Sequence, residues 1–174
     1  MKAYLQRLFL CVACLALCEP AAFARGKALR CSSDHGTSVD MPISLAIGTV
    51  RTPEFPVKHK LYLIEFEANW NLPTNEIRCM MGFQLTPGYH ECKLEPVIET
   101  EWTLFDGSRI VARGSDKGRS GDFEAGACYL GRFIGCFTGE SRHRYVLEVK
   151  FTKDGTPLDG TNPKLVVSVI DGPM

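Results

Sequence analysis

Leu61-Tyr-Leu-Ile-Glu-Phe-Glu-Ala-Asn-Trp70 has the clearest strand pattern in the sequence. Apolar side chains alternate along it with more polar ones. One face carries Tyr62, Ile64, Phe66, Ala68 and Trp70, and the other carries Glu65, Glu67 and Asn69. A period of two is the pattern of a half-buried strand. We therefore expect a strand with its aromatic face in a core and its glutamates in water.

The same alternation recurs in residues 98–104 and 145–151, and a last strand is expected at 164–170. Asp106-Gly107 predicts a hairpin turn, with 109–113 as the return strand. Earlier strands are expected near 42–47 and 54–57, the second beside prolines that favour an edge. Only residues 76–83 suggest a helical turn. The pattern predicts an all-β fold: a single two-sheet antiparallel β-sandwich of about seven to eight strands with little helix, spanning residues 41–174.

The first 24 residues have the composition of an export signal. Lys2 and Arg7 precede a short apolar run, and Ala22-Phe-Ala24 offers a small-x-small cleavage site. Residues 25–40 are then expected to form an N-terminal lead-in. These features predict a periplasmic or secreted protein, with no transmembrane segment. A lipid anchor is not expected, because bulky Leu17 precedes Cys18.

Charge excludes one class of partner. The chain has 20 basic and 20 acidic residues, and removal of residues 1–24 changes its formal net charge from 0 to −1. No basic run stands out, so nucleic acid is not an expected partner.

Five of the eight cysteines remain after residue 24. Their spacing does not match zinc or thioredoxin-type sites, so disulfides are the expected use. Two bridges among five cysteines leave fifteen arrangements open. We favour the sequence-local pairs Cys79–Cys92 and Cys128–Cys136, with Cys31 free or paired between chains.

The two stretches between these cysteine pairs carry the candidate binding residues. A disulfide-closed loop is already ordered, so it presents apolar side chains to a partner at lower entropic cost. Tyr and Arg are also frequent anchors of protein interfaces. The candidates are Met80, Met81, Phe83 and Tyr89 in the first stretch and Tyr129, Arg132 and Phe133 in the second.

Two alternatives stay open beside a non-catalytic protein-binding role. The pairs Glu65/Glu67 and Glu99/Glu101 place carboxylates side by side, as a small periplasmic hydrolase would need, although we expect them to face water. Trp70 and Trp102 could form the platform of a carbohydrate-binding module, although their register favours the core. The four histidines are scattered, so neither a metal nor a cofactor is expected.

Three segments carry a family resemblance: Trp102-Thr-Leu-Phe-Asp-Gly107, Arg144-Tyr-Val-Leu-Glu-Val149 and Asn162-Pro-Lys-Leu-Val-Val167. They resemble small exported proteobacterial β-sandwich proteins classed as a domain of unknown function. The resemblance implies an envelope location and a β fold, and it implies no catalytic residues. An immunity or inhibitor protein of the bacterial envelope is one concrete version of the expected binding role.

Overall fold

The structure is a computed structural model, and it describes residues 36–58, 60–83, 92, 94–118, 123–126 and 128–170. The export signal expected at residues 1–24 lies outside these ranges, as do Cys31 and Tyr89.

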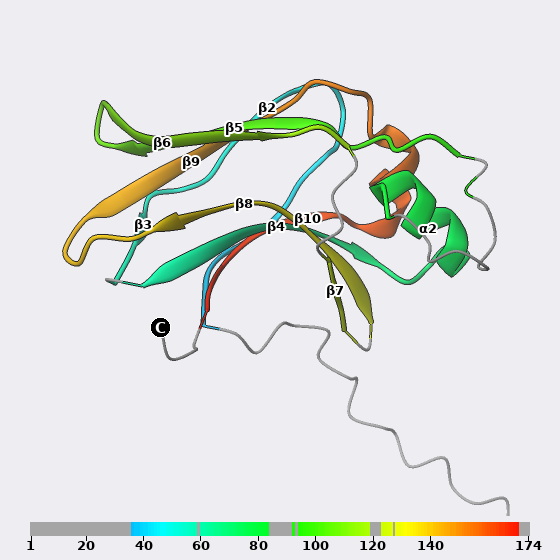
Figure 1. Ribbon diagram of the computed structural model, residues 1–174, viewed down its shortest axis with the longest axis horizontal. Coiled ribbons are helices and arrows are strands. Elements are labelled where there is room, and N and C mark those ends of the chain that lie inside the picture. The colour runs from blue at the N-terminus through cyan, green and yellow to red at the C-terminus, as the bar shows by residue number, and fades with distance from the viewer. Residues whose placement is uncertain are drawn as a thin grey trace, which may run out of the picture. The chain divides into compact units, whose positions relative to one another are not determined.

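The chain forms two antiparallel sheets of five strands each (Figure 1). The first sheet has the order β1 (Thr37–Pro42), β10 (Lys164–Val169), β4 (Leu61–Asn69), β8 (Tyr129–Thr138) and β7 (Phe123–Ala125). The second has the order β2 (Gly48–Arg51), β9 (Arg144–Phe151), β5 (Thr100–Asp106) and β6 (Arg109–Asp116), with β3 (Phe55–Pro56) also paired to β9. Helix α2 (Thr74–Met81) and the 3-10 helix η1 (Thr156–Thr161) complete the described elements.

The all-β class and the antiparallel pairing are confirmed, but the expected strand count was too low. The described part of the chain contains ten strands instead of seven or eight. The additional ones are short or lack a clear alternation: β7 has three residues, β1 carries a register shift between Thr37 and Val39, and the ten-residue β8 has Arg132 on its inner face. β1 also begins inside the expected lead-in, at Thr37, whereas the strand expected near 42–47 is a loop. Short strands with one or two inward side chains leave too little alternation to detect.

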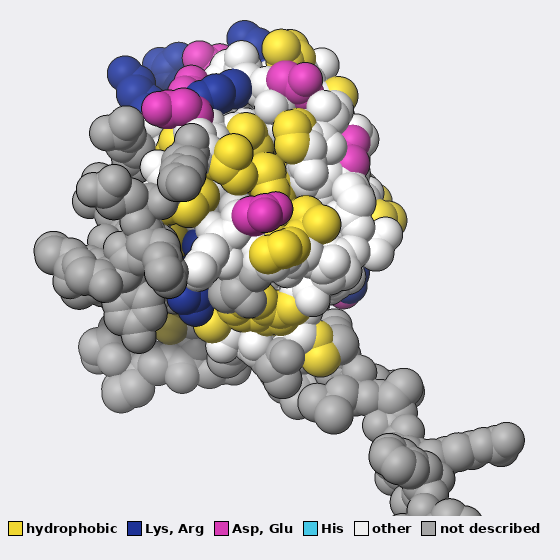
Figure 2. All heavy atoms as spheres, turned by 90° about the vertical axis from the view of Figure 1, so that its right-hand side faces the viewer, with side chains coloured by type: hydrophobic (Ala, Val, Ile, Leu, Met, Phe, Trp, Pro, Cys, Tyr) yellow, Lys and Arg dark blue, Asp and Glu magenta, His cyan; other side chains and the backbone are white. Residues whose placement is uncertain are grey.

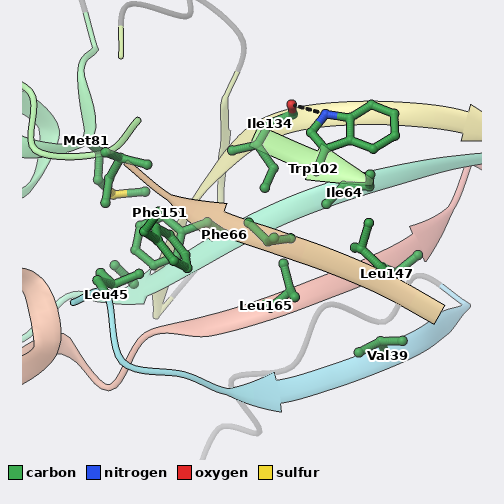
Figure 3. Packing of buried hydrophobic residues seen from close by; sticks show 14 of the residues in the cluster. Val39, Leu45, Ile64, Phe66, Met81, Trp102, Ile134, Leu147, Phe151 and Leu165 are labelled. Atoms are coloured by element: carbon green, nitrogen blue, oxygen red, sulfur yellow. Dashed lines mark hydrogen bonds between the residues drawn. The ribbon is translucent and has the colours of Figure 1, made fainter. Parts of the chain in front are cut away.

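The core lies between the two sheets and takes its side chains from both inner faces (Figure 3). The apolar face of β4 is buried there as predicted, with Tyr62, Ile64, Phe66 and Ala68 all almost fully covered. Trp102 of the opposite sheet is also in the core, where its indole Nε1 donates a 3.0 Å hydrogen bond to the carbonyl of Ile134. Because the indole N–H has this partner, burial of the ring leaves no polar group without a hydrogen bond.

Two glycines make room for that indole. A Cβ atom placed on Gly114 of β6 would lie 2.6 Å from the Trp102 ring, and one on Gly135 of β8 would lie 2.3 Å from it. Both distances are far below carbon contact. The tryptophan thus fits between strands of the two sheets because these positions have no side chain.

Helix α2 confirms the helical turn expected at residues 76–83 and begins two residues earlier. It ends at Gly82, whose φ of 87° is in the left-handed region that glycine adopts without strain. The amides of Gly82 and Phe83 bond the carbonyls of Cys79 and Arg78, which closes the helix. Among the described residues, none of the helices has the length and apolar character that a bilayer crossing requires.

Candidate functional site

The first expected disulfide is confirmed. Cys79 of α2 is bonded to Cys92, with their Cα atoms 5.4 Å apart. A structural disulfide favours an oxidising compartment over the cytoplasm. Residues 84–91 of the stretch between them, including Tyr89, lie outside the described residues.

Three binding candidates from that stretch are core residues instead. Met80, Met81 and Phe83 are all buried. They fall on the side of α2 and its C-terminal turn that packs against the sheets, so the expectation that they are displayed on a loop was wrong. Amphipathic helix residues and loop residues look alike over so short a stretch.

The second expected disulfide, Cys128–Cys136, is wrong. Cys136 is a free, exposed thiol, whereas Cys128 is disulfide-bonded with a partner outside the described residues. Cys128 directly precedes β8, and Cys136 is the eighth residue of that strand. Eight residues of extended chain separate their Cα atoms by about 26 Å, far beyond the roughly 7 Å that a disulfide spans.

The residues between these cysteines are accordingly strand residues. Phe133 is half-buried, and Tyr129 is buried with its hydroxyl donating a 2.9 Å hydrogen bond to Glu124. Burial, followed by Glu124, raises the pKa of Tyr129.

Arg132 is completely buried on the inner face of β8. Its Nη2 lies 2.5 Å from a carboxylate oxygen of Asp116, and its Nη1 donates hydrogen bonds to the carbonyls of Met81 and Gly118. Desolvation lowers the pKa of Arg132, and Asp116 opposes that shift. The side chain therefore joins β8, the C-terminus of α2 and the end of β6, and is unavailable to a partner.

The outward side of the first sheet carries an unexpected group of carboxylates. Glu65 and Glu67 lie on β4, and Glu124 lies two strands away on β7, with Gly131 of β8 paired to both Glu67 and Glu124. Gly131 has no side chain, and the Tyr129 ring lies 3.7 Å from the position that a Cβ on Gly131 would take. We call this side, with Glu65, Glu67 and Glu124, the acidic face.

Glu65 and Glu67 do not face water as expected, because both are buried. Glu65 is only 2% exposed, and its Oε1 has no hydrogen-bond partner. Burial, then Glu124 and Glu67, raise the pKa of Glu65 to about 7. A carboxyl in such surroundings holds its proton near neutral pH, which is the property of a general acid.

The second glutamate pair is unrelated to this group. Glu101 lies on β5 of the other sheet, and Glu99 directly precedes that strand. Glu99 is half-buried near Lys153, and Glu101 is exposed near Lys150. The four glutamates of the two pairs do not form one site.

The tryptophans form no open platform. Trp102 is in the core, as its register predicted. Trp70 is half-buried, with its Nε1 donating to the carbonyl of Gly126 at 3.2 Å and the Arg78 guanidinium over its ring.

Exposed apolar side chains gather instead at the end of the molecule that carries α2 and η1 (Figure 2). Ile47 is 68% exposed and Leu94 is 44% exposed. The Ile47 loop is held to η1 by hydrogen bonds from Ser44 and Leu45 to Asp159. The Leu94 segment is held to α2 by the bond from the Val97 amide to the Met80 carbonyl. We call this region, defined by Ile47 and Leu94, the apolar end.

Sequence reasoning missed Glu124, Ile47 and Leu94. Isolated apolar residues in loops carry no periodic signal. Glu124 is distant in sequence from Glu65 and Glu67, and it reaches their side of the sheet because β7 pairs with β8 and β8 pairs with β4. Within the described ranges, no group of three or more His, Cys, Asp or Glu side chains has the arrangement of a metal site.

Comparisons with known proteins establish similarity in fold alone. No protein-family model matches the chain, and no curated protein matches it. A crystal structure of a protein from Sulfurospirillum deleyianum is similar, with a TM-score of 0.53 and 10% sequence identity, over 77% of this chain and 98% of that one.

Proposed function

We propose that this chain is a non-catalytic, exported binding protein of the bacterial envelope, a two-sheet β-sandwich that engages a protein partner through its apolar end. The observation that carries the proposal is the exposure of Ile47 and Leu94 at one end of the molecule. An immunity or inhibitor protein is a concrete form of this role.

Physical chemistry supports a contact at this place. Large apolar side chains that are exposed on one surface raise the free energy of the protein in water, and a partner that covers them lowers it. The backbone beneath them is fixed by the Asp159 hydrogen bonds and by the Cys79–Cys92 disulfide. A surface that is already ordered has less entropy to lose on binding.

The experiment compares charged substitutions at three exposed apolar positions. The mature protein is used to capture a partner from the envelope and secreted proteins of its source, and the affinity is then measured with that partner purified. Ile47→Asp and Leu94→Asp should each weaken binding at least about 30-fold, as expected for interface anchors worth 2 kcal/mol or more. Their melting temperatures should stay near that of the wild type.

Ile110→Asp is the matched control. Ile110 is 54% exposed, but it lies on β6 beside the β5–β6 hairpin rather than at the apolar end. Equal binding by all three variants and the wild type would refute the proposal, as would equal loss in all three.

A small hydrolase is the second candidate, and the burial of Glu65 with its pKa of about 7 favours it. In that case Glu65 would donate a proton to a leaving group and Glu67 would act as its partner carboxylate. Turnover of a glycoside panel that falls at least 100-fold in Glu65→Gln, but not in Glu101→Gln, would support this role. Turnover that Glu65→Gln leaves unchanged would exclude Glu65 as the acid.

A further inference from the structure

A pocket of about 570 Å³ lies where β3 and the first residues of β4 meet the start of β1 and the end of β10. β3 belongs to the second sheet and the other three strands belong to the first, so the pocket lies between the two sheets. β3 and the start of β4 are at the end of the molecule opposite α2 (Figure 1). Binding sites for small molecules usually have volumes of about 300–1,000 Å³, and this pocket falls in that range.

Backbone hydrogen bonds hold the walls of the pocket in place. The Val169 amide at the end of β10 donates to the carbonyl of Gly36 at 3.3 Å. In the segment before β4, the carbonyl of Lys60 accepts a 2.9 Å hydrogen bond from the Gly139 amide. The pocket is therefore formed before any ligand arrives, which lowers the entropic cost of binding.

The interior of the pocket is mainly apolar. Val57 and Tyr62 line it and are almost fully buried, and Val169 lines it and is half-buried. The Tyr62 ring is fixed by stacking on Phe137, with the two ring centroids 5.2 Å apart. These side chains favour a ligand with an apolar body, because binding here removes hydrocarbon surface from water.

Two hydroxyl groups add hydrogen-bond donors to this lining. The Tyr62 hydroxyl accepts a 2.8 Å hydrogen bond from the Lys58 amide, and its own hydrogen has no acceptor within the described chain. Ser38 also lines the pocket and lies at the register shift of β1, because Thr37 and Val39 pair with consecutive residues of β10 and Ser38 pairs with none. A bulge of this kind changes the direction of a side chain and is frequent beside functional sites.

Two lysines give the pocket a positive rim. Lys58 and Lys60 both line it, and among the described residues around it none is acidic. Lys58 is exposed, and it forms no ion pair with any residue that the structure describes. An ammonium group that has no carboxylate beside it attracts an anion, and nearby hydroxyls can donate to the oxygen atoms of that anion.

We propose that this pocket binds a small organic anion with an apolar body, such as a medium-chain fatty acid. The apolar body lies against Val57, Tyr62 and Val169. The anionic group lies at the rim, beside Lys58 and Ser38. The site goes beyond the proposed function, because it is at the end of the molecule opposite α2, whereas the apolar end carries α2 (Figure 1).

Titration of the mature protein with decanoate tests the site. Calorimetry should show saturable binding. Decanol has the same chain length without the charge, and acetate has the charge without the apolar body, so each should bind at least about tenfold more weakly than decanoate. In amide NMR spectra, decanoate should shift the signals of Ser38, Val57 and Val169 and leave those of Ile47 and Leu94 in place.

Charge reversal at the rim is the second test. Lys58→Glu should weaken decanoate binding at least about tenfold, because it replaces a charge-assisted contact with a repulsive one. High salt should weaken binding by the wild type for the same electrostatic reason. Lys117→Glu is the matched control and should bind decanoate as the wild type does, since Lys117 is also exposed but directly follows β6 near the end of α2.

Three results would each overturn the proposal: no binding of decanoate, equal affinity for decanol and decanoate, or equal affinity of Lys58→Glu and the wild type for decanoate. Amide shifts confined to Ile47 and Leu94 would also overturn it, because they would place decanoate at the apolar end. None of these assays uses a protein partner. Failure here is therefore distinguishable from failure of the partner-binding role proposed for Ile47 and Leu94.

Discussion

Removal of the Arg132 guanidinium should be among the most damaging single changes to this fold. Arg132→Met keeps an unbranched apolar stem, but it leaves Asp116 without its cation and two carbonyls without their donor. Breaking a buried ion pair from one side costs about 3–5 kcal/mol. We expect a loss of this size in the free energy of unfolding, measured in urea with the disulfides intact.

A double-mutant cycle separates the ion pair from simple packing. Asp116→Asn removes the charge and retains the side-chain oxygen that accepts from the Gly118 amide. In the Arg132→Met background this second change should recover about 2 kcal/mol, because it removes an unpaired buried charge. Additive effects of the two substitutions, or a loss below about 1 kcal/mol for Arg132→Met alone, would refute the assigned role of the pair.

Three further predictions follow from the core and the cysteines. Gly135→Ala should destabilise the protein by about 1–3 kcal/mol and change tryptophan fluorescence, because the added Cβ would overlap the Trp102 ring. Gly160→Ala should do neither, because no atom lies within 4 Å of the position of its Cβ. Iodoacetamide should label Cys136 but not Cys79, Cys92 or Cys128 in the folded, unreduced protein, and labelling of Cys128 would contradict its disulfide. Cys92→Ser should cost about 3 kcal/mol by opening the loop of 13 residues, and an unchanged unfolding midpoint would show that the loop is ordered without the bond.

The sequence was sufficient for strands that have one apolar and one polar face. β9 and the inner face of β4 were predicted residue by residue, since Tyr145, Leu147, Val149 and Phe151 alternate without interruption. β8 was missed because its pattern breaks: Arg132 points into the core, Gly131 and Gly135 have no side chains, and Tyr129 is buried on the other side. A strand covered on both faces loses the contrast on which a period-two prediction depends.

The same dependence on the contrast between the two faces of a strand explains why the burial of the candidate site was not predicted. Alternation correctly assigned Glu65 and Glu67 to the side of β4 away from the core, but it contains no information about what lies over that side. Burial of Glu65 makes the difference between a solvated carboxylate and one with a pKa of about 7, and that burial depends on residues distant in sequence.

The two candidate functions make different demands on the acidic face. A catalytic carboxyl must meet its substrate, so a hydrolase needs Glu65 to become accessible while the carboxyl keeps its raised pKa. Partner binding at the apolar end makes no such demand on Glu65 or Glu67. Glu65→Gln is therefore the variant that separates the two roles: a loss of turnover with unchanged affinity for the partner would assign the acidic face to catalysis. Unchanged turnover would leave the apolar end as the functional surface.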